Sequence, residues 1–129
     1  MVLLYRGARD EMIGTMFHSK CDNKGETIAL IKNEKGNIFG GYASIPWTSD
    51  GKYHSAPESF IFTLTNIHNI KPTKFPIKND KYEVFHYDNC GPCFGHGTDI
   101  FIETNNNQSY FAYTYISVIG KENLLLLEI

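Results

Sequence analysis

The sequence lacks the long apolar runs and the excess of basic residues that define two common classes of protein. Even the closing run, Leu124–Leu127, is far short of the roughly 20 residues that a bilayer-spanning helix needs. Lys and Arg number 12 against 14 Asp and Glu, so no basic stripe exists to neutralise a phosphate backbone. We therefore expect neither membrane insertion nor nucleic acid as a partner.

Signals for secretion and for known catalytic frames are also missing. The segment Met1–Asp10 contains an arginine and an aspartate where a signal peptide needs apolar residues. The cysteines number three, which argues against a secreted disulfide framework. No Gly-x-Ser-x-Gly elbow, paired catalytic carboxylates or phosphate-binding glycine loop with a following lysine occurs. We expect a cytoplasmic protein, more plausibly noncatalytic than an enzyme, with no catalytic residue and no cofactor.

What the chain does contain is typical of one folded domain spanning residues 1–129. Its 129 residues are 42% hydrophobic and 14% aromatic, which suffices for a single core. One helix is predicted, capped by Asp10, because Met12, Ile13, Met16 and Phe17 recur at helical spacing.

Most of the remaining chain has the short, β-branched and aromatic segments of strands. The strands are predicted at Met1–Tyr5, Thr27–Lys32, Ile38–Ser44, Ser59–Leu64, Thr73–Ile77, Tyr82–Tyr87, Asp99–Glu103, Tyr110–Ile119 and Leu124–Ile129. The second and third should form a hairpin around Lys35-Gly36-Asn37. Gly40 and Gly41 indicate a bulge or a close approach of another backbone, with a binding groove as the alternative. The predicted fold is α+β and mostly β: a sandwich of two antiparallel sheets with a helix packed around it.

Cys90-Gly91-Pro92-Cys93 has the same residues as the redox motif of thioredoxins. That chemistry places the first cysteine at a helix N-terminus, where the helix dipole lowers the thiol pKa. Here Phe94-Gly95-His96-Gly97 follows, which makes a helix start improbable. Two ordinary loop thiols are the leading interpretation, and a thiol-based redox enzyme using Cys90 and Cys93 stays an alternative.

The same segment offers a metal-binding alternative. His86, Cys90, Cys93 and His96 are of the residue types that bind zinc. However, four ligands within so short a segment are tighter than the usual paired half-sites, and strand alternation decides where His86 points. A zinc-stabilised structural domain therefore remains a second alternative. The histidines at positions 18, 54 and 68 are interpreted as solvated or satisfied within the core.

An ordered set of segments over nearly the whole chain resembles the TLDc family, whose name comes from its association with TBC and LysM domains. The segments are Leu3–Arg6, Phe17–Cys21, Gly36–Tyr42, Pro46–Trp47, Ser59–Leu64, Gly91-Pro92-x-Phe94-Gly95, Asp99–Ile100 and Glu128. The cysteines at 90 and 93 are not part of the family pattern. The resemblance implies a β-sandwich with helices packed around it. Compared with the family, the chain begins almost at the first strand, without the usual N-terminal helical extension, and is short between Asn107 and Tyr115.

The resemblance also implies a function. Members of the family protect cells against oxidative damage, and several bind the vacuolar-type proton ATPase. The leading hypothesis is therefore an interaction module with contacts in the loops Ile45–Glu58 and Asn89–Thr98. The candidate contact residues are Trp47 and, from the family's glycine-rich loop pattern, Gly91, Pro92, Phe94, Gly95 and Asp99.

Overall fold

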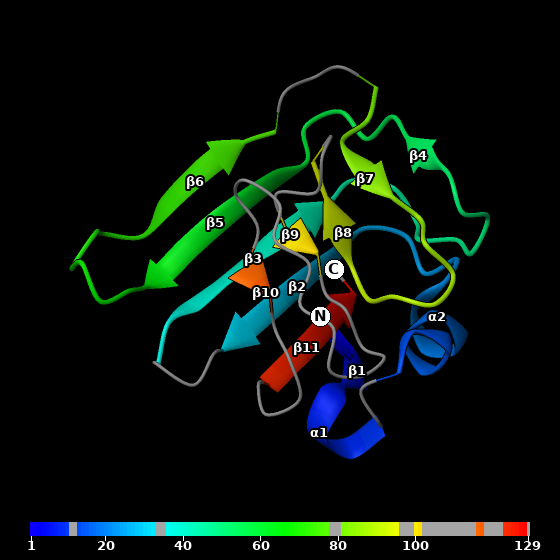
Figure 1. The fold of residues 1–129 in the computed structure, drawn as a ribbon, viewed down its shortest axis with the longest axis horizontal. Coiled ribbons are helices and arrows are strands. Elements are labelled where there is room, and N and C mark those ends of the chain that lie inside the picture. The colour runs from blue at the N-terminus through cyan, green and yellow to red at the C-terminus, as the bar shows by residue number, and fades with distance from the viewer. Residues whose placement is uncertain are drawn as a thin grey trace.

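The protein is described by a computed structural model that covers residues 1–10, 13–32, 36–77, 81–95, 100–101, 116–117 and 123–128. Its strands form two sheets that lie face to face, with two short helices at one end (Figure 1). The helices are α1 (Gly7–Asp10) and α2 (Gly14–Cys21). The predicted α+β, mostly β sandwich with a packed helix is confirmed.

The larger sheet has six strands, and every neighbouring pair in it is antiparallel. In spatial order the strands are β1 (Val2–Arg6), β11 (Asn123–Glu128), β2 (Thr27–Lys32), β3 (Ile38–Ala43), β5 (Phe60–Thr65) and β6 (Thr73–Pro76). The predicted hairpin is the β2–β3 pair, in which Thr27 lies opposite Ala43 and Lys32 opposite Ile38.

Among the described residues, the smaller sheet has five strands of two residues each. In spatial order they are β10 (Ile116–Ser117), β9 (Ile100–Phe101), β8 (Cys93–Phe94), β7 (Val84–Phe85) and β4 (Tyr53–His54). The pairs are antiparallel except β9 with β10, which run parallel.

Alternation along the strands of the larger sheet separates an inner from an outer face. In β2, Thr27, Ala29 and Ile31 are buried, while Ile28 and Leu30 between them are partly exposed. Because successive side chains point to opposite faces of a strand, the first three residues belong to the core between the sheets. The other two lie on the outer face, which is therefore also apolar.

Trp47 occupies the centre of the core. Its ring meets Phe17 of α2 edge-on, with 6.0 Å between ring centroids, and Phe94 of β8 edge-on at 5.5 Å. Its Nε1–H donates a hydrogen bond of 2.9 Å to the Thr27 hydroxyl of β2. One side chain thus joins the helix, both sheets and the loop that follows β3, and edge-on aromatic pairs add to the stability that burial provides.

Gly40 and Gly41 lie where neighbouring atoms leave no room for a side chain. A Cβ on Gly40 would stand 1.9 Å from the backbone oxygen of Ala29, and one on Gly41 would stand 2.6 Å from the ring of Phe94. The predicted close approach of another backbone is confirmed at Gly40, whereas at Gly41 an aromatic ring from the facing sheet packs on the strand. The irregularity in the β3–β5 pairing lies between Ile38 and Phe39, before both glycines.

Several predicted boundaries differ from the structure. The prediction that Asp10 caps the main helix is wrong: Ile13 is the N-cap of α2 and makes no side-chain cap bond. Asp10 instead ends α1, accepts the Arg6 amide at 2.9 Å and pairs with Arg9. The strand predicted over Tyr82–Tyr87 shortens to β7, and β4 and β8 form where loops were predicted.

Some predictions fall outside the described residues. These include Met12, Lys35 of the hairpin turn, the segment between Asn107 and Tyr115, and most of the strands expected over Asp99–Glu103 and Tyr110–Ile119. Neither helix in the described part of the chain has the length and apolarity that crossing a membrane requires.

Candidate functional site

The loop between β3 and β4 is anchored to His86, the residue that follows β7. The Nδ1 atom of His86 accepts the Thr48 amide at 3.0 Å and lies 2.7 Å from the Thr48 hydroxyl. The backbone adds two bonds, from the Gly51 amide to the His86 oxygen at 2.7 Å and from the His86 amide to the Lys52 oxygen at 2.9 Å. Both the ring and the backbone of this histidine therefore fix the loop.

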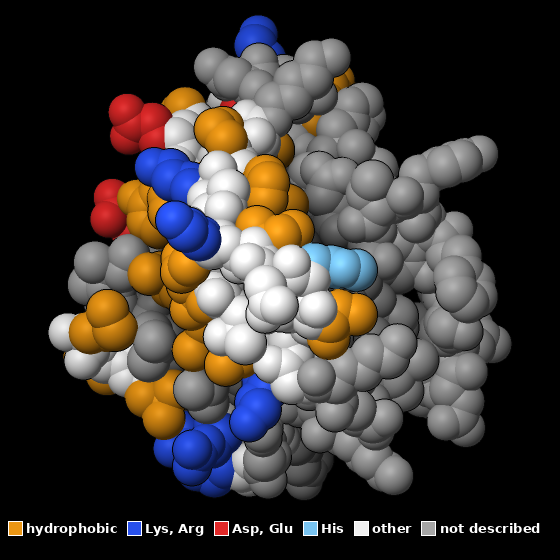
Figure 2. Space-filling model, turned by 90° about the vertical axis from the view of Figure 1, so that its left-hand side faces the viewer, with side chains coloured by type: hydrophobic (Ala, Val, Ile, Leu, Met, Phe, Trp, Pro, Cys, Tyr) orange, Lys and Arg blue, Asp and Glu red, His pale blue; other side chains and the backbone are white. Residues whose placement is uncertain are grey.

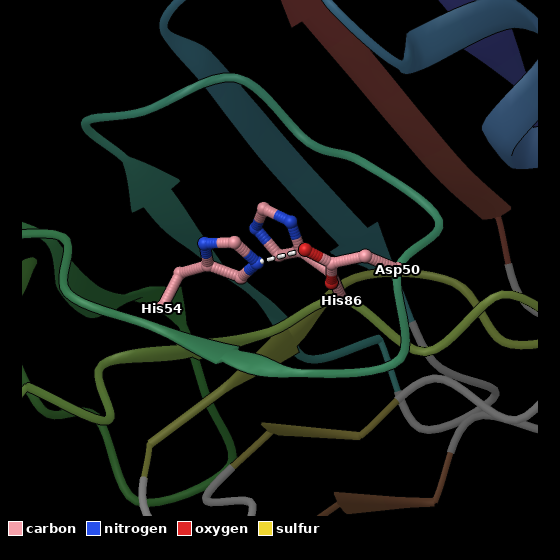
Figure 3. Close-up of side chains that lie close together, drawn as sticks. All are labelled: Asp50, His54 and His86. Carbon is pink, nitrogen blue, oxygen red and sulfur yellow. Dashed lines mark hydrogen bonds and ion pairs between the residues drawn. The ribbon is translucent and has the colours of Figure 1, made fainter.

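At this anchor Asp50, His54 and His86 come together. Each offers one potential ligand atom, and these atoms all lie within 4.8 Å of one another. His54 Nε2 is 2.7 Å from Asp50 Oδ2, and the imidazole of His54 stacks on that of His86 with 4.0 Å between centroids. Figure 3 shows the three side chains gathered between the loop and the end of β7.

The three groups differ in exposure and in proton affinity. His86 is 1% exposed, whereas the side chains of His54 and Asp50 are 30% and 37% exposed. Burial, reinforced by the nearby His54, lowers the pKa of His86 to about 4, so this ring is neutral at pH 7. Although desolvation opposes the change, hydrogen bonds from the Lys52 amide and His54 lower the pKa of Asp50.

His86 Nε2 has no hydrogen-bond partner among the described residues. Since Nδ1 accepts the Thr48 amide, the proton of the neutral ring resides on Nε2. A buried polar atom without a partner is uncommon and costs stability. Both carboxylate oxygens of Glu83, which is 1% exposed, are in the same situation within the described part of the chain.

Cys90 and Cys93 do not have the setting that dithiol chemistry requires. Both are buried, and neither is in a disulfide. Cys93 belongs to the short strand β8, and its thiol contacts the Gly91 oxygen at 3.4 Å. Neither cysteine therefore stands at the N-terminus of a helix in the part of the chain that the structure describes. Burial raises the pKa of the third thiol, Cys21 of α2, to about 12.

The predicted zinc set of His86, Cys90, Cys93 and His96 does not assemble around His86. Within the described ranges, His86 lies in a group of possible metal ligands whose other members are Asp50 and His54. Neither cysteine belongs to this group. His96 lies outside the described residues. The physical reason is strand alternation: His54 of β4 and Phe94 of β8 both lie opposite Val84 of β7, two residues before His86, so Cys93, next to Phe94, points to the other face of the sheet.

The predicted contact residues are mostly internal. Trp47 is 1% exposed and Phe94 is 0% exposed, so neither ring can touch a partner directly, which corrects their prediction as surface contacts. Gly91, Pro92 and Gly95 are buried as well, and Asp99 lies outside the described residues.

The sequence prediction missed Asp50 and treated His54 as unrelated to His86. The available signal was weak, since an aspartate and a histidine four positions apart also occur in ordinary turns. The two other unassigned histidines agree with their interpretation. His18 is buried and bonded to Asp22 Oδ1 at 2.7 Å and to the Tyr87 oxygen at 2.6 Å, and His68 is exposed.

An open groove lies on the outer face of the six-stranded sheet. Its volume is about 450 Å³, and it is lined by Ile28, Leu30, Phe60, Phe62, Thr63, Leu64, Pro72, Thr73 and Lys74. Lys74 places its ammonium 4.3 Å from the centroid of the Phe60 ring, and Tyr42 stacks on the same ring at 5.1 Å. Figure 2 shows hydrophobic and basic side chains side by side on the flank of the molecule that carries β5 and β6.

Two face-to-face sheets around a buried tryptophan, with an apolar outer face, define a small sandwich domain of the mostly β class. The chain belongs to the TLDc family, because the model of the TLDc domain matches residues 1–125. A stretch of 50 residues is also 32% identical to the MTOR-associated protein MEAK7 of Danio rerio. That stretch is 39% of this chain and covers 11% of the relative.

Proposed function

We propose that this TLDc domain is a noncatalytic protein-interaction module of the cytoplasm that binds subunits of the vacuolar-type proton ATPase and contributes to protection against oxidative damage. The family supports this proposal, since several of its members bind that enzyme. The name of the zebrafish relative describes an association of that protein with MTOR, which also favours protein binding as the class of activity.

The observation that carries the proposal is the apolar outer face of the six-stranded sheet. An antiparallel sheet with one face in water ordinarily presents polar side chains on that face. Here Ile28, Leu30, Phe60 and Phe62 are all partly exposed, and Leu64 is 42% exposed. Contiguous exposed apolar surface marks sites of protein association.

The charge of the groove indicates what its partner should carry. Lys74 is the one charged residue among those that line it. A partner segment with apolar side chains and a carboxylate near the Lys74 ammonium would therefore fit the surface.

The groove also revises the location of the contacts. Trp47 and Phe94 belong to the loops predicted as contacts, Ile45–Glu58 and Asn89–Thr98, but both rings are buried. Contacts by these loops, if the partner reaches them, must come from other side chains or from the backbone.

The test is a binding assay between this domain and purified vacuolar-type proton ATPase, with Leu64→Glu as the probe variant. Leu64 lines the groove and is exposed, so the change removes apolar contact without disturbing the core. Ile67→Glu is the matched control, since Ile67 is 62% exposed, follows the same strand and does not line the groove. The proposal predicts at least roughly tenfold weaker binding for Leu64→Glu, equivalent to about 1.4 kcal/mol, and no change for Ile67→Glu.

A second variant separates the interaction from thiol chemistry. Replacing Cys90 and Cys93 by serine should leave binding intact, because neither thiol lies in the groove. No binding of the wild-type domain to the purified complex, or equal losses in both glutamate variants, would contradict the proposal.

A further inference from the structure

We propose that Asp50, His54 and His86 form a binding site for a divalent transition-metal ion of the zinc type. Two imidazoles and one carboxylate are a recurrent protein ligand set for such ions. The three side chains offer ligand atoms within 4.8 Å of one another, on two segments that are distant in the sequence. The site is separate from the outer-sheet groove and does not depend on its function.

The unpartnered Nε2 of His86 is the second observation that points to a ligand. The ring is 1% exposed, so water reaches it poorly, and no protein atom of the described residues satisfies this nitrogen. His54 stacks on the ring with 4.0 Å between centroids, and because each imidazole directs its lone pair in its own ring plane, the partly exposed His54 has to rotate out of the stack to share an ion with His86. An ion bound to Nε2 would give this buried atom the partner that it lacks.

Thr48 supplies the outer contact that a metal-binding histidine needs. When Nε2 binds an ion, the ring proton moves to Nδ1, and the Thr48 hydroxyl at 2.7 Å is placed to accept it. The Thr48 amide then loses Nδ1 as its acceptor, because that nitrogen now carries a proton. Metal binding is therefore coupled to a change in the hydrogen bonding of the Thr48 amide.

The pair formed by Asp50 and His54 has the freedom to adjust around an ion. Their Oδ2 and Nε2 atoms are 2.7 Å apart, whereas two ligands of one tetrahedral ion stand roughly 3.3 Å apart, given bond lengths of about 2.0–2.1 Å. Both side chains are partly exposed, so a small rotation is open to them. The Lys52 amide holds Asp50 Oδ1 at 3.0 Å and keeps the carboxylate at the site.

An ion bound here would connect the segment Thr48–His54 to His86, the residue that follows strand β7. Three protein ligands leave one position of a tetrahedral ion to water or to a further ligand. Because the ion requires the protein fold to assemble its ligands, binding would stabilise the folded state, and the gain would grow with the logarithm of the ion concentration once that concentration exceeds the dissociation constant.

The experiment is a calorimetric titration of ZnCl₂ into the chelator-treated, dialysed whole chain. The proposal predicts a single saturable site in the wild type. His54→Phe removes one ligand while keeping a ring that can stack on His86, and it should abolish the site. His68→Phe removes an exposed histidine elsewhere and should bind zinc like the wild type. Thr48→Val should weaken binding roughly 10- to 100-fold through loss of the outer contact.

A spectroscopic measurement on the wild type tests the site without relying on the folding of any variant. In ¹H–¹⁵N spectra of the wild type, zinc should shift the Thr48 amide signal, and the amide signals of the distant β5–β6 hairpin should stay in place. The proposal is overturned if the wild type binds no zinc, if folded His54→Phe binds it with unchanged affinity, or if the Thr48 signal stays in place at saturation.

Discussion

Protonation of His86 should decrease the stability of this domain as the pH is lowered through a defined window. The pKa of this ring is lowered from 6.5 to about 4 in the folded protein, chiefly by burial. As the pH falls below 6.5, His86 takes up a proton in the unfolded chain, whereas in the folded chain it stays neutral until the pH approaches 4. The free energy of unfolding is therefore unaffected above pH 6.5, decreases between pH 6.5 and pH 4, and loses nothing further from this group at lower pH.

The size of the effect follows from the difference between the two pKa values. One pKa unit corresponds to 1.36 kcal/mol, so a shift of two to three units gives a full loss of about 3 kcal/mol. At pH 4.5 most of that loss, about 2.5 kcal/mol, should already be present. Against a total stability of roughly 5–15 kcal/mol for a domain, this is a large fraction. Asp10 and Asp50 act in a lower window, because their pKa values are lowered from 3.8.

The measurement is urea unfolding at a series of pH values between 7.5 and 4.5, with a chelator present so that no metal ion occupies the ring. Trp47 is the single tryptophan and is buried beside His86 at 5.3 Å, so its fluorescence reports on this core. His86→Asn is the control, because an asparagine oxygen can accept the Thr48 amide in place of Nδ1 but does not titrate. Parallel stability profiles for the wild type and His86→Asn would refute the assignment of this pH dependence to His86.

Three further perturbations test the packing of the core. Gly41→Ala should destabilise the domain by about 1–3 kcal/mol, because its Cβ would meet the Phe94 ring at 2.6 Å; adding Phe94→Leu should recover part of the loss in chemical denaturation. Trp47→Phe and Thr27→Val each break the same buried hydrogen bond, and a double-mutant cycle should show a coupling of about 1 kcal/mol between them. Strict additivity of the two losses would mean that the bond contributes nothing to stability. The Cys21 thiol, with its pKa raised to about 12 by burial, should react with iodoacetamide in urea but not in the native protein, as mass spectrometry of the labelled peptide would report.

The strands with strong local patterns were predictable from the sequence. The strand Thr27–Lys32 and the hairpin that it forms with the next strand were located because segments rich in apolar residues lie on either side of a glycine-containing turn. The two-residue strands β4 and β8 were not predicted, since they exist through pairing with β7 and β9 rather than through any propensity of their own. Tertiary pairing of this kind leaves no periodic signal in a single sequence.

Only part of the candidate site was predictable, again because its residues are brought together by the fold and not by their spacing in the sequence. His86 was recognised as a potential ligand, but its neighbours in space come from a loop that precedes it by dozens of residues; Thr48, which contacts its ring, is 38 positions away. Sequence spacing favoured the cysteines at 90 and 93 because they are near in the chain. The aromatic residues of the family pattern, Trp47 and Phe94, were expected at the surface, yet they pack against each other between the sheets.

The position of β11 in the larger sheet has a consequence for the synthesis of the protein. This strand lies between β1 and β2, so the neighbour of Val2–Arg6 in the sheet is Asn123–Glu128. During translation, β1 leaves the ribosome long before β11 and has to wait for that strand before it can pair. The hairpin β2–β3 can form early, whereas an edge of β2 and all of β1 stay open to wrong partners until Glu128 emerges. A ribosome that stalls before Asn123 would therefore hold a chain in which β1 lacks its neighbour in the sheet.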